Sequence, residues 1–242
     1  MTETQSTAIA VTGLTKSFGN LYALRNLSFS LNKGEFLTIF GPNGAGKTTL
    51  IRILSTLTKA SSGEIRIADF SFENDSEKIR RQIGVIAHQT FLYENLTAEE
   101  NLRFYGRLYD VENLPKKIET LLSEVGLELR KKDFVRTFSR GMQQRLAIAR
   151  AMLHEPSILL LDEPYTGLDQ HASEMLTNWL KRLRSAEQTI LMVTHDLEQG
   201  MELADRIAVL VKGKLVLNQA QQEIDPKKFR QTYYDLVEKD KR

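Results

Sequence analysis

Short hydrophobic runs, separated by turn-forming residues, dominate the first third of the chain. Four of these runs have the length and composition of β-strands, and they occupy residues 8–11, 27–31, 36–40 and 64–67. Turn residues lie between them, at Asn32-Lys33-Gly34 and Ser61-Ser62-Gly63. This spacing predicts several short strands in the first third.

The hydrophobic pattern changes to a helical period between about residues 97 and 154. Leu102, Tyr105 and Leu108 are predicted on one helix face, and a second helix carries Ile118, Leu121, Leu122 and Val125 on one side. We therefore expect a helical subdomain at about 97–154, inserted into a domain built on strands.

Three more short apolar runs follow, at 158–161, 189–193 and 207–211, with a helix-like segment at 172–184. Apolar strands alternating with helices predict a parallel sheet covered by helices, so the fold class is α/β. The length of 242 residues suits a single domain over 1–242. In the tail, at about 218–242, Phe229, Tyr233 and Leu236 among charged residues predict a short amphipathic helix that lies on the domain.

A glycine-rich segment directly after the run at 36–40 matches the phosphate-binding template G-x-x-x-x-G-K-[ST]. Its residues are Gly41, Pro42, Asn43, Gly44, Ala45, Gly46, Lys47 and Thr48. Glycines let backbone N–H groups surround an anion, and the start of a helix adds favourable potential. We expect Lys47 to reach the β and γ phosphates of ATP, Thr48 to bind Mg²⁺ and Thr49 to donate to the α phosphate. A glycine-rich turn that binds nothing is disfavoured, because both the residue types and their flanking pattern fit.

Two acids end the apolar run at 158–161. At the carboxyl edge of a parallel strand they would lie beside the phosphate crevice. Asp162 is expected to hold Mg²⁺, and Glu163 to act as the general base on the attacking water. Alternatively, the Asp-Glu-Pro run simply caps the next helix.

The composition is nearly balanced in charge, with 33 basic and 31 acidic side chains and a formal net charge of +2. This gives no support to a nucleic-acid-binding surface. Residues 1–8 are polar, no stretch approaches the roughly 18 apolar residues of a membrane span, and there is no cysteine. We expect a cytosolic chain without disulfides or thiolate metal sites.

Taken in order, these motifs resemble the ATP-binding subunits of ABC transporters, over about residues 8–217. The resemblance implies that Phe18, or less favourably Tyr22, stacks on adenine, and that Gln89 senses Mg²⁺ and contacts the membrane partner. It assigns His195 as the switch histidine at the γ phosphate. It also implies the P-loop NTPase fold of ABC ATPases, with a parallel-sheet core, an antiparallel β subdomain and an inserted helical subdomain.

The segment 138–145 resembles the family's signature motif, and 167–169 resembles the loop that signals between monomers. Phe138, Arg140 and Met142 replace the leucine, first glycine and glutamine of the commonest form, whereas Ser139 and Gly141 are retained. A hydroxyl and a backbone N–H at a helix start suffice to contact the γ phosphate held by a second copy. Arg140 either adds a cation near that phosphate or lies on a solvated edge.

The remaining histidines and the aromatic residues have less specific interpretations. His88 is interpreted as packing beside Gln89, and His154 and His171 as loop or helix-surface residues. Phe91 and Tyr93 either dock a membrane helix or, with Phe104, Tyr105 and Tyr109, fill the core of the helical lobe; core packing is the favoured interpretation.

The resemblance implies a transport ATPase that acts at the cytoplasmic face of the membrane. Two copies of the chain would close around two ATP molecules. Both copies would be bound to separately encoded membrane subunits. The rival is a soluble ATPase of the same superfamily acting on DNA or ribosomes, but the chain has neither long coiled coils nor two fused ATPase domains. The segments 100–105, 139–142 and 162–169 are most similar to the haem exporter ATPase of cytochrome c maturation, while exporters of lipid, drug or polysaccharide share parts of the pattern.

Overall fold

Two β-sheets and a group of helices make up the fold in the computed structural model, which describes residues 6–87 and 89–239. The smaller sheet has the order β2-β1-β4-β5 and is antiparallel. Its strands are β1 (Thr7–Phe18), β2 (Leu21–Asn32), β4 (Ser62–Ile67) and β5 (Phe70–Ser71). The first two are longer than the hydrophobic runs that predict them, because exposed polar residues interrupt the buried positions along both strands.

The larger sheet has the order β10-β9-β3-β8-β7-β6 and is parallel except at the edge strand β10. It contains β3 (Phe36–Phe40), β6 (Ile83–Ala87), β7 (Ile158–Asp162), β8 (Thr189–Thr194), β9 (Arg206–Val211) and β10 (Lys214–Ala220). Phe40 pairs with Thr194 and Asp162 pairs with Val193. The carboxyl ends of β3, β7 and β8 therefore lie at one edge, where ligands of parallel sheets bind.

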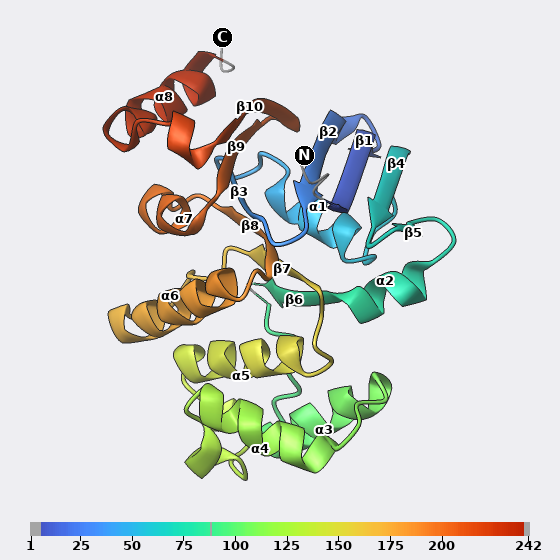
Figure 1. The fold of residues 1–242 in the computed structure, drawn as a ribbon, viewed down its shortest axis with the longest axis vertical. Helices are drawn as coiled ribbons and strands as arrows, with labels where there is room; N and C mark the ends of the chain where they lie inside the picture. The colour runs from blue at the N-terminus through green and yellow to red at the C-terminus, as the bar shows by residue number, and fades with distance from the viewer. Residues whose placement is uncertain (1–5, 88, 240–242) are drawn as a thin grey trace, which may run out of the picture.

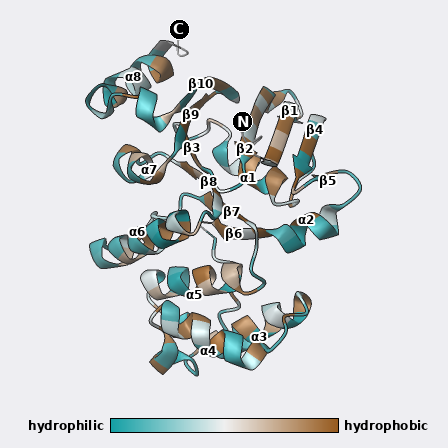
Figure 2. Ribbon diagram, viewed as in Figure 1, coloured by the Kyte–Doolittle hydropathy of each residue, from teal (hydrophilic) through white to brown (hydrophobic). Residues whose placement is uncertain are grey.

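Helix α1 (Lys47–Leu54) lies between the two sheets, as Figure 1 shows. Its apolar residues share one hydrophobic core with the inner face of the small sheet and with β3, β7 and β8. The helices α2 (Ser76–Gln82), α6 (Gln170–Ser185) and α7 (Leu197–Leu203) flank the sheets. Figure 2 shows hydrophobic residues concentrated on the central strands, whereas α2 and α6 carry many hydrophilic residues. This distribution fits a buried sheet covered by amphipathic helices.

A helical lobe occupies one end of the molecule (Figure 1). It contains α3 (Ala98–Leu108), α4 (Leu114–Glu124) and α5 (Arg140–Met152), with two short 3-10 helices, η1 (Glu128–Arg130) and η2 (Val135–Thr137), between α4 and α5. A capping box starts α3, since the Thr97 side chain accepts from the Glu100 N–H and the Glu100 carboxylate accepts from the Thr97 N–H. The predicted α/β fold with a parallel core, an antiparallel subdomain and an inserted helical subdomain is thus confirmed.

Two predictions about the lobe's core are wrong. Leu108 is exposed, whereas Leu102 is buried, because six residues along a helix turn the side chain by about 240° from the starting face. The interpretation of the aromatic residues as core is also wrong for Phe91, Tyr93 and Phe104, which are 38%, 49% and 39% exposed. These rings lie at the lobe surface.

The tail forms η3 (Gln221–Glu223) and α8 (Pro226–Lys239). Phe229 and Tyr233 are buried, and the Phe229 ring lies 5.4 Å from the ring of Phe40. The predicted amphipathic helix is confirmed, although β10 continues to Ala220, past the predicted start of the tail. Within residues 6–87 and 89–239, the structure has no helix that combines the length and the apolar character of a membrane span.

Candidate functional site

The glycine-rich segment forms a tight loop between β3 and α1 in which glycine is required by space and by backbone conformation. A Cβ atom on Gly41 would lie 2.4 Å from the carbonyl oxygen of Leu210, and one on Gly46 would lie 2.4 Å from that of Ala23. Gly44 and Gly46 have φ values of 79° and 109°, which favour glycine. The loop therefore has the close backbone turn that an anion-binding nest needs.

Lys47 is buried at the start of α1 and its ammonium group is fully occupied. Nζ donates to the carbonyl oxygens of Gly41 and Pro42 at 2.6 and 3.2 Å, and it lies 3.2 Å from Oε1 of Glu163. An ammonium has three donors. The loop and the acid at the end of β7 thus hold the lysine in place.

The two acids that follow the strand point to different partners. Asp162 accepts a hydrogen bond from the Thr48 hydroxyl at 3.2 Å, so one acid reaches the start of α1. Glu163 has a φ of 50°, and its N–H donates to the Val193 carbonyl. This left-handed conformation turns the second side chain away from the first, so the two carboxylates face different groups.

Glu163 joins β7 to the end of β8. Its Oε2 accepts from the Thr194 hydroxyl at 3.1 Å and from the His195 N–H at 3.2 Å, and it lies 2.8 Å from Nδ1 of His195. A carboxylate can only accept, so Nδ1 carries the proton in this contact. Thr194 is not among the predicted site residues, and its only signal in the sequence is its place as the last residue of β8.

A cavity of 630 Å³ opens beside these residues, within the size range of small-molecule sites. It brings together six of the predicted residues: Asn43, Thr48, Gln89, Asp162, Glu163 and His195. Gln89, an exposed residue directly after the undescribed His88, lines the same cavity. The prediction for His88 lies outside the described residues.

The oxygen donors at the cavity fit a magnesium ion better than a soft metal. A threonine hydroxyl, a carboxylate and a glutamine side chain are offered by Thr48, Asp162 and Gln89, and oxygen is the ligand that Mg²⁺ prefers. In the described part of the chain, no group of three His, Cys, Asp or Glu side chains is close enough to hold a metal. Such a partial donor set suits an ion that also binds phosphates.

The signature residues do not line this cavity. Ser139 caps α5, accepting from the Met142 N–H at 3.3 Å, and is exposed. A Cβ on Gly141 would lie 3.2 Å from the Cβ of Ala172 on α6, so glycine allows the two helix starts to approach. The aromatic candidates Phe18 and Tyr22 are also outside the cavity, exposed on the β1–β2 hairpin beneath Lys16 and Arg25 respectively.

A second cavity of 250 Å³ adjoins the first, and Phe91 lines both. The guanidinium of Arg150 lies over the rings of Phe91 and Tyr105, at 5.7 and 5.2 Å from their centres. Its Nη2 donates to the Val85 carbonyl at 2.7 Å, while its Nε is buried without a partner among the described residues. Burial lowers the pKa of Arg150, so the second cavity is lined by a poorly solvated cation.

His154 lines the same second cavity, which corrects its interpretation as a surface residue. Its ring stacks on that of Tyr109 with centres 3.9 Å apart, and Nε2 lies 3.0 Å from the Ile83 carbonyl. Burial lowers the pKa of His154 below 6.5. His171, in contrast, is exposed on α6 as predicted.

Comparison with known proteins identifies the family. A family model described as ABC transporter matches residues 24–166. The chain is 35% identical over 203 residues to the linearmycin resistance ATP-binding protein LnrL of Bacillus subtilis, a match that spans 83% of this chain and 65% of that relative. It is 36% identical over 211 residues to the Nod factor export ATP-binding protein I of Rhizobium johnstonii, covering 86% of this chain and 68% of the relative.

The structure is similar to a solved dimeric ABC cassette, MJ0796, in a post-hydrolysis state bound to ADP and phosphate. The TM-score is 0.80 at 30% sequence identity, and the match covers 88% of this chain and 98% of the cassette. The strand-loop-helix with Lys47 and the two acids after β7 lie within residues 24–166, which the family model matches. The chain therefore belongs to the ABC transporter family of ATP-binding, ATP-hydrolysing subunits.

Proposed function

We propose that this chain hydrolyses Mg²⁺-ATP in the 630 Å³ cavity and thereby drives an ABC exporter. The observation that carries the proposal is the meeting of Lys47, Thr48, Asp162 and Glu163 at one sheet edge, where each side chain already contacts another. A phosphate nest, a metal-binding pair and a separate carboxylate are the parts that phosphoryl transfer to water requires.

Thr48 and Asp162 would hold Mg²⁺, with Gln89 contributing its side-chain oxygen. The hydroxyl and the carboxylate are 3.2 Å apart and line the cavity with the glutamine. When bound, the ion would neutralise negative charge that develops on the phosphates during transfer. Lys47 exchanges its carbonyl and carboxylate partners for phosphate oxygens. The backbone N–H groups of the loop at 41–46, except at Pro42, which has none, and the Thr49 hydroxyl complete the phosphate site.

Glu163 is proposed as the general base. When Lys47 binds phosphate, the ion pair between Lys47 and Oε1 of Glu163 breaks. Oε2 keeps its contacts with Thr194 and His195, which orient the carboxylate. The carboxylate then takes a proton from the attacking water while His195 contacts the γ phosphate. Phe18, on the exposed hairpin, is proposed to stack on the adenine.

We infer that a second copy completes the site. Ser139 and Gly141 lie at the start of α5 and outside the cavity of their own chain. A head-to-tail dimer would place them against the γ phosphate of the other copy. The similarity to a dimeric cassette supports this arrangement.

We propose that a separately encoded membrane subunit docks at Phe91 and Tyr93. Both rings are exposed, and Phe91 joins the nucleotide cavity to the second cavity. The partner would hold the chain at the cytoplasmic face of the membrane. The small net charge of +2 gives no support to nucleic acid as the partner in place of a membrane subunit.

The cargo we propose is an organic molecule moved outward. The relative named for Nod factor export supports export over uptake. Haem export for cytochrome c biogenesis is the second candidate, and it rests on the resemblance of the segments 100–105, 139–142 and 162–169. The same ATPase site would also serve an exporter of lipid, drug or polysaccharide.

Purification from membranes in mild detergent tests this function. We expect the chain to be recovered with a membrane-spanning protein and to release phosphate from ATP. Recovery with DNA or ribosomes in place of a membrane subunit would favour the soluble ATPase class, and absence of ATP hydrolysis would reject both.

A further inference from the structure

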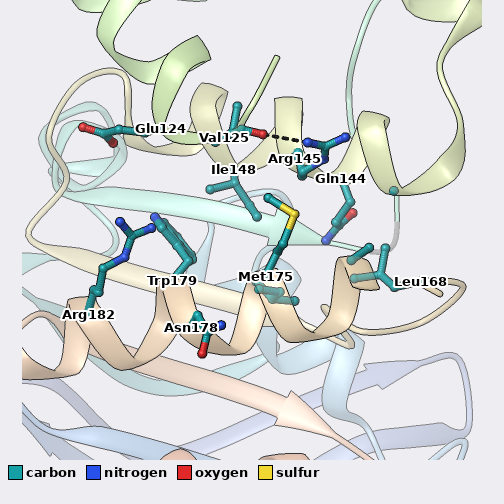
Figure 3. Close-up of a pocket in the computed structure, with 13 residues that line it drawn as sticks. Glu124, Val125, Gln144, Arg145, Ile148, Leu168, Met175, Asn178, Trp179 and Arg182 are labelled. Atoms are coloured by element: carbon teal, nitrogen blue, oxygen red, sulfur yellow. Dashed lines mark hydrogen bonds between the residues drawn. The ribbon is translucent and has the colours of Figure 1, made fainter. Parts of the chain in front are cut away.

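A cavity of 170 Å³ lies between α5 and α6, where the helical lobe meets the core, separate from the nucleotide site. Figure 3 shows Ile148 pointing from α5 toward Met175 and Trp179 of α6. Ile148, Leu176 and Trp179 are almost fully buried. The volume is close to the roughly 150 Å³ of an apolar protein cavity that accepts benzene. One aromatic ring therefore matches the space.

Met175 forms an adjustable wall at the opening. Its Cε ends 4.0 Å from the position that a Cβ on Gly126 would take, so the side chain crosses from α6 toward the segment after α4. Methionine is flexible and its sulfur favours contact with aromatic rings. A ligand can thus enter by displacement of one side chain.

Positive charge exceeds negative charge around this cavity. Arg182 follows Trp179 by one helical turn, and its guanidinium makes no hydrogen bond or ion pair within residues 6–87 and 89–239. Arg145 lies at the opposite end, where Nη1 donates to the Val125 and Gly126 carbonyls at 3.0 and 3.2 Å. Glu124 is the single acid among the described lining residues. The excess of cations favours an anionic ligand.

We propose that this cavity binds a small aromatic carboxylate, with its ring between Ile148 and Trp179 and its carboxylate at Arg182. The ring replaces water against the buried apolar wall. The carboxylate accepts charge-assisted hydrogen bonds from the unpaired guanidinium.

Binding at this position would act on ATP hydrolysis through α5. The same seam holds Gln144, whose Nε2 donates to the Pro164 carbonyl at 3.2 Å, one residue after Glu163. Gly141 meets Ala172 at its other end. A ligand that fixes α5 against α6 therefore fixes the position of Ser139. This effect rests on the proposed function, whereas the binding itself does not.

Trp179 is the only tryptophan in the chain, so its fluorescence reports on the cavity directly. The probe is benzoate, with benzyl alcohol as the uncharged control, added to the full-length chain. We expect a saturable fluorescence change with a Kd of about 1 mM, the scale that ligand efficiency allows for so small a molecule. Benzyl alcohol should bind at least about tenfold more weakly, because it lacks the charged hydrogen bonds.

Three variants separate specific binding from nonspecific quenching. Arg182→Gln should weaken benzoate binding about tenfold, and Glu124→Gln should strengthen it because a like charge is removed. Arg107→Gln changes an exposed arginine on α3 outside the cavity and should leave the affinity unchanged. No saturable change, equal binding of benzyl alcohol, or unchanged affinity in Arg182→Gln would each overturn the site.

The rate of phosphate release is measured in parallel. We expect benzoate to change this rate over the same concentration range as the fluorescence, and Arg182→Gln to shift both curves together. Binding without any change in rate would overturn the coupling through α5. A chain that does not hydrolyse ATP even without benzoate would instead reject the proposed function. The fluorescence measurement would still test the binding site.

Discussion

At the residue scale, Glu163 and Lys47 form one linked unit. Glu163→Gln should leave ATP binding intact and slow hydrolysis by at least about a hundredfold, the usual scale for loss of a general base. The amide is almost the same shape, but it cannot take the proton from water. Equilibrium nucleotide binding and phosphate release measure the two effects, and a Glu163→Gln chain that turns over like wild type would remove this residue from the mechanism.

Lys47→Ala should abolish productive ATP binding, because the remaining loop lacks the cation that its phosphates need. The replacement also leaves Oε1 of the partly buried Glu163 without its 3.2 Å ion-pair partner. Nucleotide binding measured by equilibrium dialysis checks the result, with Lys59→Ala, an exposed lysine elsewhere, as the control. Wild-type affinity in Lys47→Ala would contradict the phosphate-site assignment.

His154 predicts a specific acid sensitivity. Its folded pKa is lowered by burial, whereas the unfolded value is about 6.5. Below that pH the unfolded chain takes up a proton that the folded chain resists, so stability is lost as pH falls through about 6.5. Denaturant midpoints measured between pH 8 and about pH 5.5 should fall less in His154→Asn than in wild type. The exposed His171→Asn should follow wild type, and equal slopes in all three chains would contradict the prediction.

At the scale of elements, the segment between β6 and α3 links the nucleotide cavity to the lobe surface. Phe91→Ala with Tyr93→Ala should weaken binding of the membrane subunit or transport, while basal ATPase activity is retained. Both rings are partly exposed, so the free energy of unfolding should fall by much less than the roughly 3 to 5 kcal/mol lost with each fully buried ring. Tyr93 does touch Phe104, with centres 5.0 Å apart, so a small loss is expected.

Co-purification beside a thermal melt decides this prediction. The matched control is Tyr234→Ala, an exposed ring on α8 at the opposite end of the molecule (Figure 1). An unfolded double variant would show that the rings are structural, and a stable one that still couples normally would also reject docking.

At the scale of the whole molecule, the start of α5 lies outside its own nucleotide cavity. ATP should therefore convert Glu163→Gln from monomer to dimer, because closure is not reversed by hydrolysis. Adding Ser139→Arg should block the dimer by steric and charge conflict, whereas Ser123→Arg, on the exposed end of α4, should not. Light scattering measures the mass, and a mass that is the same with and without ATP would contradict closure of the isolated subunit.

The sequence alone determined those parts of the protein that depend on local chemistry. The loop at 41–48, the acids at Asp162 and Glu163, and the apolar runs of β3, β7, β8 and β9 are readable because glycine conformation, charge and continuous burial leave direct signals. The strands β5, β6 and β10 were not predicted. All three are edge strands, and β5 is also only two residues long, so their residues carry a weaker pattern.

Only the tertiary structure decided which side chains meet. Sequence spacing did not show that Thr194 and His195 share one oxygen of Glu163, since the contact arises from the pairing of β7 with β8. The hydrophobic pattern also placed Phe91 and Tyr93 in a core, and that prediction is wrong. Hydrophobicity gives a ring only a tendency to be buried, and the packing of neighbouring helices decides which rings are covered. The cavity at Trp179 likewise exists because α5 and α6, whose first residues are Arg140 and Gln170, come together in a long-range contact that no local pattern encodes.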